Sequence, residues 1–305
     1  MHELTPEYIP LGSSDIMVSR LGIGTNTWGS FGKADPAMKS AFDAAIDLGI
    51  NFFDTAEIYQ LNGSEMTLGQ FLPGAHPKAI VETKIFPLPW RLSAKRLLPA
   101  LRASLARLNL ERVDIYMIHF PLPPVSIEAW MDAFAGAVEM GLVRAVGVSN
   151  YNADQMKRAI AALGKRGIHL AVNQVEYSLV RRAPERDGLL DLCKEMGVTL
   201  IAYRPLASGL LTGKYTLEQM PPAGRRSLTV TRAEVARVQP VVGLLRQIGE
   251  AHGGKTPGQV ALNWLIAKGA LPIPGANNLA QMQSNAAALG WRLTSDEVAA
   301  LDAAG

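Results

Sequence analysis

The feature that most limits the fold of this chain is a regular alternation of short apolar runs with amphipathic segments. Most of the runs begin about 30 residues apart, which is the length of one strand followed by one helix. The strand-like runs are LGIGT near residue 21, NFFDTA near 51, KAIVETK near 78, VDIYMIH near 113, LVRAVGVS near 142, LAVNQVEY near 170, VTLIAYR near 198 and ALPIPG near 270. Eight such units predict an α/β fold in which a parallel sheet closes into a (β/α)8 TIM barrel with helices outside.

The segments between these runs have the spacing of amphipathic helices. Clear examples are DPAMKSAFDAAIDLG, SAKRLLPALRASLARL and SIEAWMDAFAGAVEMG. Three of the predicted helices end just before a glycine that leads into the next strand, at Gly49, Gly141 and Gly197. We find no domain boundary, so residues 1–305 are predicted to form a single barrel domain.

Two additions interrupt the alternation. Near the start, YIPLGSSDIMVSR has turn residues from Gly12 to Asp15 between two apolar runs, which predicts a β-hairpin that caps the barrel bottom. After the seventh strand the spacing stretches to about 70 residues. There PLASGLLTGKYTLEQMPPAGRRS is loop-like, while TPGQVALNWLIAKG is typical of a helix. A long loop at this end of a barrel favours an active-site role.

Composition excludes several classes of partner. The chain is 48% hydrophobic and 19% charged, with a net charge of only +3, as in ordinary globular proteins. Its densest basic stretch, from Arg91 to Arg107, has helical spacing among leucines, which favours a solvated helix face over a nucleic-acid patch. No uncharged apolar run reaches the roughly 18 residues that a membrane span needs. We therefore expect no nucleic-acid partner and no membrane insertion.

Cysteine and histidine usage points to a cytoplasmic protein without a metal. The single Cys193 excludes an intramolecular disulfide and fits a reducing compartment, and its helical context favours a packing role. The opening MHELTPEYIP lacks the features of a secretory signal. His2, His76, His169 and His252 have no ligand-like spacing with one another or with Cys193, so no metal site is predicted.

Four polar residues follow or end the second, third and fourth apolar runs. Asp54 comes directly after the buried pair FF, where a carboxylate needs a cation or hydrogen-bond donors. Lys84 and His119 end the next two runs, and Tyr59 lies in the loop after Asp54. Catalytic groups of such barrels project from the C-terminal strand ends, and adjacent strands are about 4.8 Å apart. The four side chains are therefore predicted to surround one small cavity.

These residue types suit proton transfer to an oxygen. Lys84 is the expected counter-ion of Asp54. An isolated tyrosine has a pKa of about 10 and is a poor acid near pH 7, but a nearby cation favours the phenolate. Lys84 is thus expected to tune Tyr59 into a proton donor, while His119 orients the same substrate oxygen by a hydrogen bond. This arrangement favours a reaction such as hydride addition to a carbonyl.

The order FFDTAEIY, VETK and DIYMIHFP closely resembles the aldo-keto reductases, and the likeness runs across nearly the whole chain. The resemblance implies that Asp54, Tyr59, Lys84 and His119 form the family's catalytic tetrad. It also implies a (β/α)8 barrel that binds a nicotinamide cofactor, normally NADPH, and reduces aldehydes or ketones to alcohols with Tyr59 as the general acid.

Further motifs resemble the family's cofactor-binding segments. GVSNY and NQVEYS are similar to those that hold the nicotinamide carboxamide, and AYRPLASGLLTGKY to the loop whose tyrosine stacks on the nicotinamide and whose remainder wraps the pyrophosphate. PIPGANNLAQMQSN resembles the segment that holds the adenosine end. The implied cofactor contacts are Gly24, Thr25, Asn26, Asp54, Ser149, Asn150, Gln174, Tyr203, Arg204, Leu206, Ser208, Gly209, Lys214, Gly275, Asn277, Gln281 and Asn285.

The chain departs from the family pattern at the cofactor site. Arg204 stands where many relatives have serine, and Gln281 stands where an arginine of the 2′-phosphate pocket is frequent. Gly275 and Asn277 also lack the positive charge that a 2′-phosphate usually recruits. NADP remains the expectation from the resemblance, and some use of NAD is a hypothesis.

Aromatic residues gather near the predicted rim and suggest an apolar-walled pocket for a small carbonyl compound. The predicted substrate contacts are Trp28, Tyr59, Phe86, Trp90, His119 and Phe120. The sequence leaves open which carbonyl is the substrate, and it leaves the oligomeric state open.

Parts of the sequence suggest three alternative interpretations. GIGTNTWG resembles a dinucleotide fingerprint, but it lacks the third glycine at the required spacing, which favours a barrel-rim turn. A cofactor-binding, redox-sensing regulatory subunit with slow or no turnover retains the same four catalytic residues and stays open. A barrel for sugar isomerisation or hydrolysis needs paired carboxylates or a metal site, and the sequence indicated neither.

Overall fold

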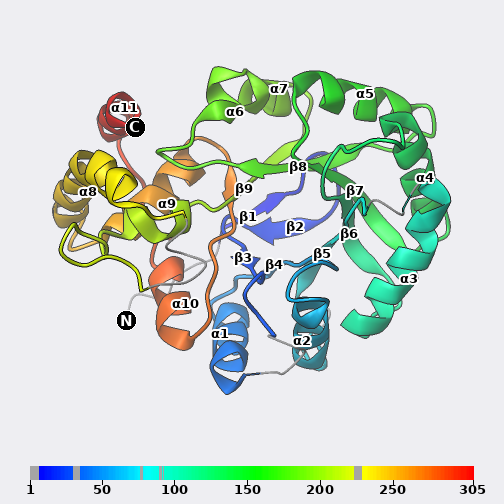
Figure 1. Ribbon diagram of the computed structural model, residues 1–305, viewed down its shortest axis with the longest axis horizontal. Helices are drawn as coiled ribbons and strands as arrows, with labels where there is room; N and C mark the ends of the chain where they lie inside the picture. Colours follow the sequence, from blue (N-terminus) through cyan, green and yellow to red (C-terminus); the bar gives the residue numbers. More distant parts are fainter. Residues whose placement is uncertain (1–6, 30–34, 76–77, 89–90, 92, 223–228) are drawn as a thin grey trace.

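A computed structural model describes residues 7–29, 35–75, 78–88, 91, 93–222 and 229–305. Within these ranges an eight-stranded parallel sheet has the order β10-β9-β8-β7-β6-β5-β4-β3 (Figure 1). Its strands are β3 (Ile23–Gly24), β4 (Phe52–Asp54), β5 (Ile80–Ile85), β6 (Val113–Ile118), β7 (Val143–Ser149), β8 (Leu170–Glu176), β9 (Thr199–Tyr203) and β10 (Leu271–Pro272). The predicted parallel sheet is confirmed.

The sheet closes on itself between its first and last strands. Gly24 pairs in parallel with Gly275, just beyond β10. The Gly22 amide donates to the Pro272 carbonyl at 3.0 Å, and the Gly24 amide donates to the Pro274 carbonyl at 3.1 Å. A Cβ on Gly24 would lie only 3.0 Å from the Ile273 carbonyl oxygen, so a glycine permits this close approach. The predicted (β/α)8 barrel is therefore confirmed.

Helices surround the barrel and connect its strands (Figure 1). Side-chain caps define several of their starts; Asn152 and Thr256, for example, each begin a helix with a capping box. The helices are α1 (Pro36–Asp47), α2 (Gly63–Phe71), α3 (Leu97–Leu108), α4 (Ile127–Glu139), α5 (Ala153–Gly164), α6 (Ala183–Arg186), α7 (Leu189–Glu195), α8 (Arg232–Ala251), α9 (Pro257–Ala267), α10 (Leu279–Ala286) and α11 (Ser295–Ala304), with 3₁₀ segments η2 (Ala94–Arg96) and η3 (Ala207–Thr212).

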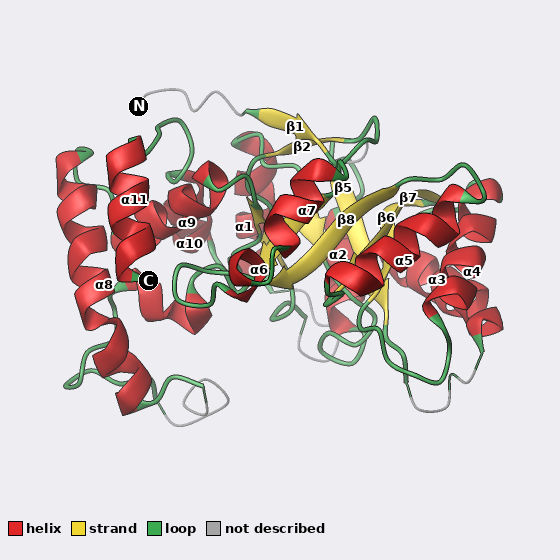
Figure 2. Ribbon diagram, turned by 90° about the horizontal axis from the view of Figure 1, so that it is seen from above, coloured by secondary structure: helices red, strands yellow, loops and turns green. Residues whose placement is uncertain are grey.

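Helix α8 was not among the predicted helices. It occupies part of the long connection between β9 and α9, and together with α11 it lies at one side of the molecule, outside α9 (Figure 2). Buried residues recur along it at Val235, Val238, Val242 and Leu245, which is the spacing of one helical face. The helix holds Pro240 in its interior, so packing rather than local propensity decides its formation.

The antiparallel hairpin of β1 (Tyr8–Pro10) and β2 (Met17–Ser19) caps the barrel as predicted. Leu11, Ile16 and Val18 are buried in a cluster with apolar side chains of the barrel interior. The turn comes close to the strands, because a Cβ on Gly12 would lie 2.5 Å from the Ala171 carbonyl oxygen. One end of the barrel interior is thus filled with apolar side chains, and polar groups are left for the other end.

Candidate active site

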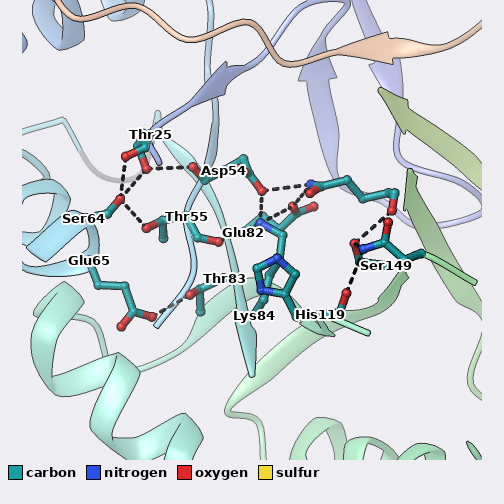
Figure 3. A network of polar contacts seen from close by, with 12 residues as sticks. Thr25, Asp54, Thr55, Ser64, Glu65, Glu82, Thr83, Lys84, His119 and Ser149 are labelled. Carbon is teal, nitrogen blue, oxygen red and sulfur yellow. Dashed lines mark hydrogen bonds and ion pairs between the residues drawn. The ribbon is translucent and has the colours of Figure 1, made fainter. Parts of the chain in front are cut away.

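The four predicted catalytic side chains meet at the C-terminal end of the barrel strands, and Figure 3 shows three of them, Asp54, Lys84 and His119. Asp54 ends β4, Lys84 is the fifth residue of β5, and His119 directly follows β6. Tyr59 lies in the loop after β4, and its ring is edge-on to the His119 ring with centroids 5.6 Å apart. The prediction that these side chains surround one place is supported by this geometry.

Lys84 is fully buried and is held by oxygen atoms. Its ammonium forms an ion pair with the Asp54 carboxylate and donates to the Thr55 carbonyl at 2.8 Å. The same nitrogen lies 5.0 Å from the centroid of the Tyr59 ring. Burial alone lowers the pKa of Lys84, but the neighbouring Asp54, Tyr59 and Glu82 outweigh it, so the net pKa is raised. The side chain is therefore a fixed cation at neutral pH.

The net pKa of Tyr59 is raised, which corrects one expectation. Burial of the phenol is the largest cause, and the charge of Asp54 adds to it, whereas Lys84 acts in the opposite direction. Lys84 thus favours the phenolate as predicted, but in the protein alone it does not overcome desolvation. The expected tuning describes one contribution to the Tyr59 pKa and not its net direction.

His119 is neutral near pH 7. Its buried ring has a pKa lowered to about 3, because burial disfavours the imidazolium and the Lys84 ammonium repels it. Its Nδ1 is buried without a hydrogen-bond partner within the described part of the chain. A neutral imidazole can orient a substrate oxygen by a hydrogen bond, while a charged acid role is disfavoured.

Two further contacts set the shape of the rim beside the tetrad. The Glu57 carboxylate pairs with the Arg91 guanidinium and accepts from the Phe86 amide at 2.6 Å. Arg91 also donates to the Phe86 carbonyl at 2.6 Å, so one ion pair fixes the loop after β5. The Phe86 ring is thereby held edge-on to His119, with centroids 5.4 Å apart. Sequence reasoning did not single out Glu57 as a site residue.

The predicted substrate aromatics fall into different places. Phe86 and Phe120 are half-buried, and the Phe120 ring stacks on His119 at 5.0 Å, so both flank the tetrad. Trp28 is fully buried, packs edge-on against Phe71 and donates from its indole to the Ala276 carbonyl at 2.8 Å. Its polar atom and ring are thus both used in the core, and contact with substrate stays a prediction. Trp90 lies outside the described residues.

The candidates for the nicotinamide end form a connected group on β7, β8 and β9. The Asn150 amide donates to the His119 carbonyl at 3.0 Å and accepts from the Tyr203 hydroxyl at 3.0 Å. The Ser149 hydroxyl donates to the Gln174 carbonyl at 2.9 Å. These bonds join the predicted cofactor residues to the tetrad, and they provide the amide and hydroxyl groups that a carboxamide can bind.

The predicted pyrophosphate segment is the 3₁₀ stretch η3. Ser208 and Gly209 have positive φ angles of 58° and 95° inside it, with Leu206 immediately before it. A Cβ on Gly209 would lie 3.3 Å from the Lys214 ammonium, so glycine leaves room for that side chain. Lys214 is exposed and has no ion-pair partner within the described residues. The Lys214 ammonium lies over the Tyr215 ring at 4.9 Å, and an exposed cation beside loop backbone with positive φ angles fits an anionic group.

The predicted adenosine end is neutral. The backbone amide of Asn277 donates to the Gln281 side-chain oxygen at 2.9 Å. The Thr27 hydroxyl donates to the Asn277 side-chain oxygen at 2.6 Å. The Asn285 amide donates to the Gly275 carbonyl at 3.2 Å, so it secures the loop after β10. None of these contacts involves a lysine or an arginine.

The remaining predicted contacts serve the strand ends. Thr25 is buried, and its hydroxyl donates to the backbone carbonyl of Asp54 at 2.8 Å. The hydroxyl therefore positions Asp54 and does not face solvent. Gly24 closes the barrel, and Asn26 is exposed. The Arg204 guanidinium lies 3.7 Å from the Glu176 carboxylate at the rim and remains half exposed.

Glu82 is a site residue that sequence reasoning missed. It lies two residues before Lys84 on β5 and is fully buried, and its carboxylate is 3.7 Å from the Lys84 ammonium. The period of two along a strand was the available signal, because it places both side chains on one face. Asp54 and Glu82 thus form paired carboxylates that the sequence had not indicated. Both are buried beside Lys84, unlike the open carboxylate pair that hydrolysis of a sugar requires.

The fold and this buried polar group define a (β/α)8 barrel with a cation, a phenol and an imidazole at the C-terminal end of its strands. The model of the Aldo/keto reductase family matches residues 20–305. The chain is 39% identical over 302 residues to the chloroplastic pyridoxal reductase of Arabidopsis thaliana, covering 92% of this chain and 82% of that protein. It is 31% identical over 293 residues to the methylglyoxal reductase YeaE of Escherichia coli K12, covering 96% and 93%.

A solved structure gives the same result. An aldo-keto reductase from Klebsiella pneumoniae in complex with NADPH superposes with a TM-score of 0.80 at 28% identity, covering 98% of this chain and 95% of that one. The chain therefore belongs to the aldo-keto reductase family and is an oxidoreductase. Within the described residues, no group of His, Cys, Asp and Glu side chains is arranged to hold a metal ion, and no helix is long and apolar enough to cross a membrane.

Proposed function

We propose that this protein reduces aldehydes or ketones to alcohols with a nicotinamide cofactor, and that it works reversibly as an alcohol dehydrogenase. The observation that carries the proposal is the buried Asp54–Lys84 ion pair beside the Tyr59 ring, with His119 against the same ring. A fixed cation, a phenol and a neutral imidazole at one point suit a reaction that places negative charge on an oxygen.

In this proposal each side chain has a separate task. When bound, the nicotinamide supplies the hydride for the carbonyl carbon. His119 donates a hydrogen bond that orients the carbonyl oxygen, and Tyr59 delivers the proton to that oxygen. Lys84 stabilises the phenolate that remains, because its charge lowers the Tyr59 pKa. The site aromatics Phe86 and Phe120 restrict the approach of water and substrate to the tetrad.

NADPH is the proposed cofactor, with some use of NADH. Family membership and the NADPH complex of the Klebsiella pneumoniae relative support NADPH. The neutral group of Thr27, Asn277 and Gln281 supports a weak preference, because it offers no cation to a 2′-phosphate. Michaelis constants for both cofactors test this point, and a large NADPH advantage would remove the NADH part. Gln281→Arg is then expected to shift the ratio toward NADPH.

Assays on a panel of carbonyl compounds can identify the substrate class. Pyridoxal, methylglyoxal, sugar aldehydes and benzaldehydes are suitable, since relatives carry the names pyridoxal reductase and methylglyoxal reductase. Loss of NADPH absorbance over many turnovers on at least one compound is the expected result. A protein that binds NADPH and completes no more than one turnover on any of them would contradict the proposal and favour a redox-sensing role.

A further inference from the structure

Glu82 is a third ionisable side chain inside the barrel, beside Asp54 and Lys84, and the reaction described above does not use it. It is the lateral neighbour of Asp54, because the two residues pair in the register between β4 and β5. Such neighbours point to one face of the sheet at a strand spacing of about 4.8 Å. The Gln174 amide joins the two carboxyl groups, since its nitrogen donates to Asp54 at 2.9 Å and to Glu82 at 2.6 Å (Figure 3).

The charges of this cluster do not balance if both acids are ionised. Asp54 and Glu82 carry two carboxyl groups, and Lys84 supplies one ammonium. No other cation of the described residues forms an ion pair with either acid. Laterally from Glu82, β6 offers only the apolar Ile115. An extra negative charge without access to water costs several kcal/mol, and a proton removes that cost.

The surroundings of Glu82 agree with a bound proton. The pKa of Glu82 is raised well above its usual value, first by burial and then by the Asp54 carboxylate, although Lys84 opposes this. Its Oε2 is buried and has no hydrogen-bond partner in the described part of the chain. Two adjacent carboxyl groups that cannot both ionise commonly hold one proton between them.

We propose that Glu82 holds a proton beside the Asp54–Lys84 ion pair, and that Glu82 is thereby a positioning residue which keeps the charge of Lys84 directed at Tyr59. The role rests on the proposed reduction, in which Tyr59 is the acid. While Glu82 is neutral, the ammonium faces one carboxylate. When Glu82 loses its proton to the solvent at alkaline pH, the ammonium faces two, and Tyr59 becomes a weaker acid because a second negative charge disfavours its phenolate.

Stability as a function of pH tests the proton without any turnover. A carboxyl group that is protonated only in the folded chain makes unfolding release a proton, so stability falls as pH rises above the ordinary glutamate range. Between pH 5 and pH 8, the unfolding constant of the unaltered chain should rise relative to that of Glu82→Gln by about tenfold per pH unit, up to the folded-state pKa. Parallel curves would overturn the proton on Glu82.

A matched control comes from helix α2, which contacts the other face of the same strand through Thr83. Glu65 is also fully buried, but its carboxylate has the Arg107 guanidinium as a partner at 2.6 Å. Glu65→Gln should therefore lower stability by an amount that does not grow with pH in this range. If Glu65→Gln shows the same pH-dependent difference, the effect does not belong to Glu82 and the proposal fails.

The pH profile of turnover tests the positioning role. In the unaltered enzyme kcat for carbonyl reduction should fall in two steps at alkaline pH. The first step occurs as Glu82 loses its proton, and the second as Tyr59 loses its proton. The Glu82→Gln enzyme should lose the first step and hold its rate to higher pH. Identical profiles would overturn the role. A chain that reduces no carbonyl fails the proposed function instead, and the unfolding curves still decide whether Glu82 holds a proton.

Discussion

The two faces of strand β5 carry related polar clusters with different consequences. The outward residue Thr83 donates to Glu65 of α2 at 2.5 Å, and Glu65 pairs with Arg107 of α3. On the inward face the Lys84 ammonium pairs with Asp54 of β4 and lies 3.7 Å from the carboxyl group of Glu82. Both clusters bury carboxylates completely, so burial of charge by itself does not identify a catalytic site.

The two clusters differ in the balance of their charges and in the side chains that lie beside them. The outer cluster pairs one carboxylate with one guanidinium, whose side chain is 21% exposed, and its other partners are neutral hydroxyls. The inner cluster pairs two carboxyl groups with one fully buried ammonium, and a phenol ring and an imidazole lie against it. The outer arrangement joins two helices to a strand, whereas the inner one places an unsolvated charge beside groups that can exchange protons.

The largest effect should come from removing the proton donor of the inner cluster. Tyr59→Phe keeps the ring against His119 and deletes only the hydroxyl, so kcat should fall about 10³-fold, or about 4 kcal/mol in the activation barrier. Cofactor affinity, measured by fluorescence titration, should stay within a factor of about three. A variant with a near-normal rate would show that another group protonates the substrate.

Removing the cation of the outer cluster should affect stability instead. Arg107→Met leaves the Glu65 carboxylate buried without its partner, which should lower the free energy of unfolding by about 3 kcal/mol. Denaturant unfolding measures this loss, and kcat per folded molecule should be unchanged. A tenfold loss of kcat in folded Arg107→Met would mean that the two faces of β5 are not functionally separate.

Removing the cation of the inner cluster should instead lower the rate of the reaction. Lys84→Met removes the charge that lowers the Tyr59 pKa, so kcat for reduction should fall about 10²-fold, or about 2.7 kcal/mol in the activation barrier. Because Tyr59 then holds its proton more tightly, the alkaline limit of the pH–rate profile should move to higher pH. An unchanged limit would separate Lys84 from the acidity of Tyr59.

The sequence was sufficient to predict the barrel and the convergence of three polar strand ends, because both follow from strand periodicity. Runs that end in Asp54, Lys84 and His119 are neighbours in a parallel barrel, so their side chains had to converge at one end. Glycines such as Gly49, with a φ of 75°, marked the helix ends correctly. These features depend on the spacing of residues along the chain, which can be read from the sequence.

Other features depend on contacts that no local pattern contains. Trp28 was expected at the substrate, but its ring direction is set by Phe71 and by the Ala276 carbonyl, both distant in sequence. The formation of α8 around Pro240 requires packing against α9 and α11. The net direction of the Tyr59 pKa is decided by desolvation, and desolvation is known only once the surrounding atoms are placed.

The smallest predicted effect is a loss of folding stability at acid pH that arises in the inner cluster and not in the outer one. His119 belongs to the inner cluster and has a folded-state pKa of about 3, whereas an unfolded histidine titrates near 6.5. Between these values the unfolded chain binds the additional proton, so the His119 contribution is fully present above pH 6.5 and is lost as the pH falls. From pH 6.5 to pH 5 this loss is about 1.5 kcal/mol.

The matching variant is His119→Asn, which removes this titration and leaves the outer cluster intact. Its free energy of unfolding should fall less steeply with acid over the same range than that of the unaltered chain. If both chains lose stability equally, the imidazole already takes up a proton in the folded state. It would then be a charged group beside Lys84, and the assignment of a neutral, oxygen-orienting His119 would have to be given up.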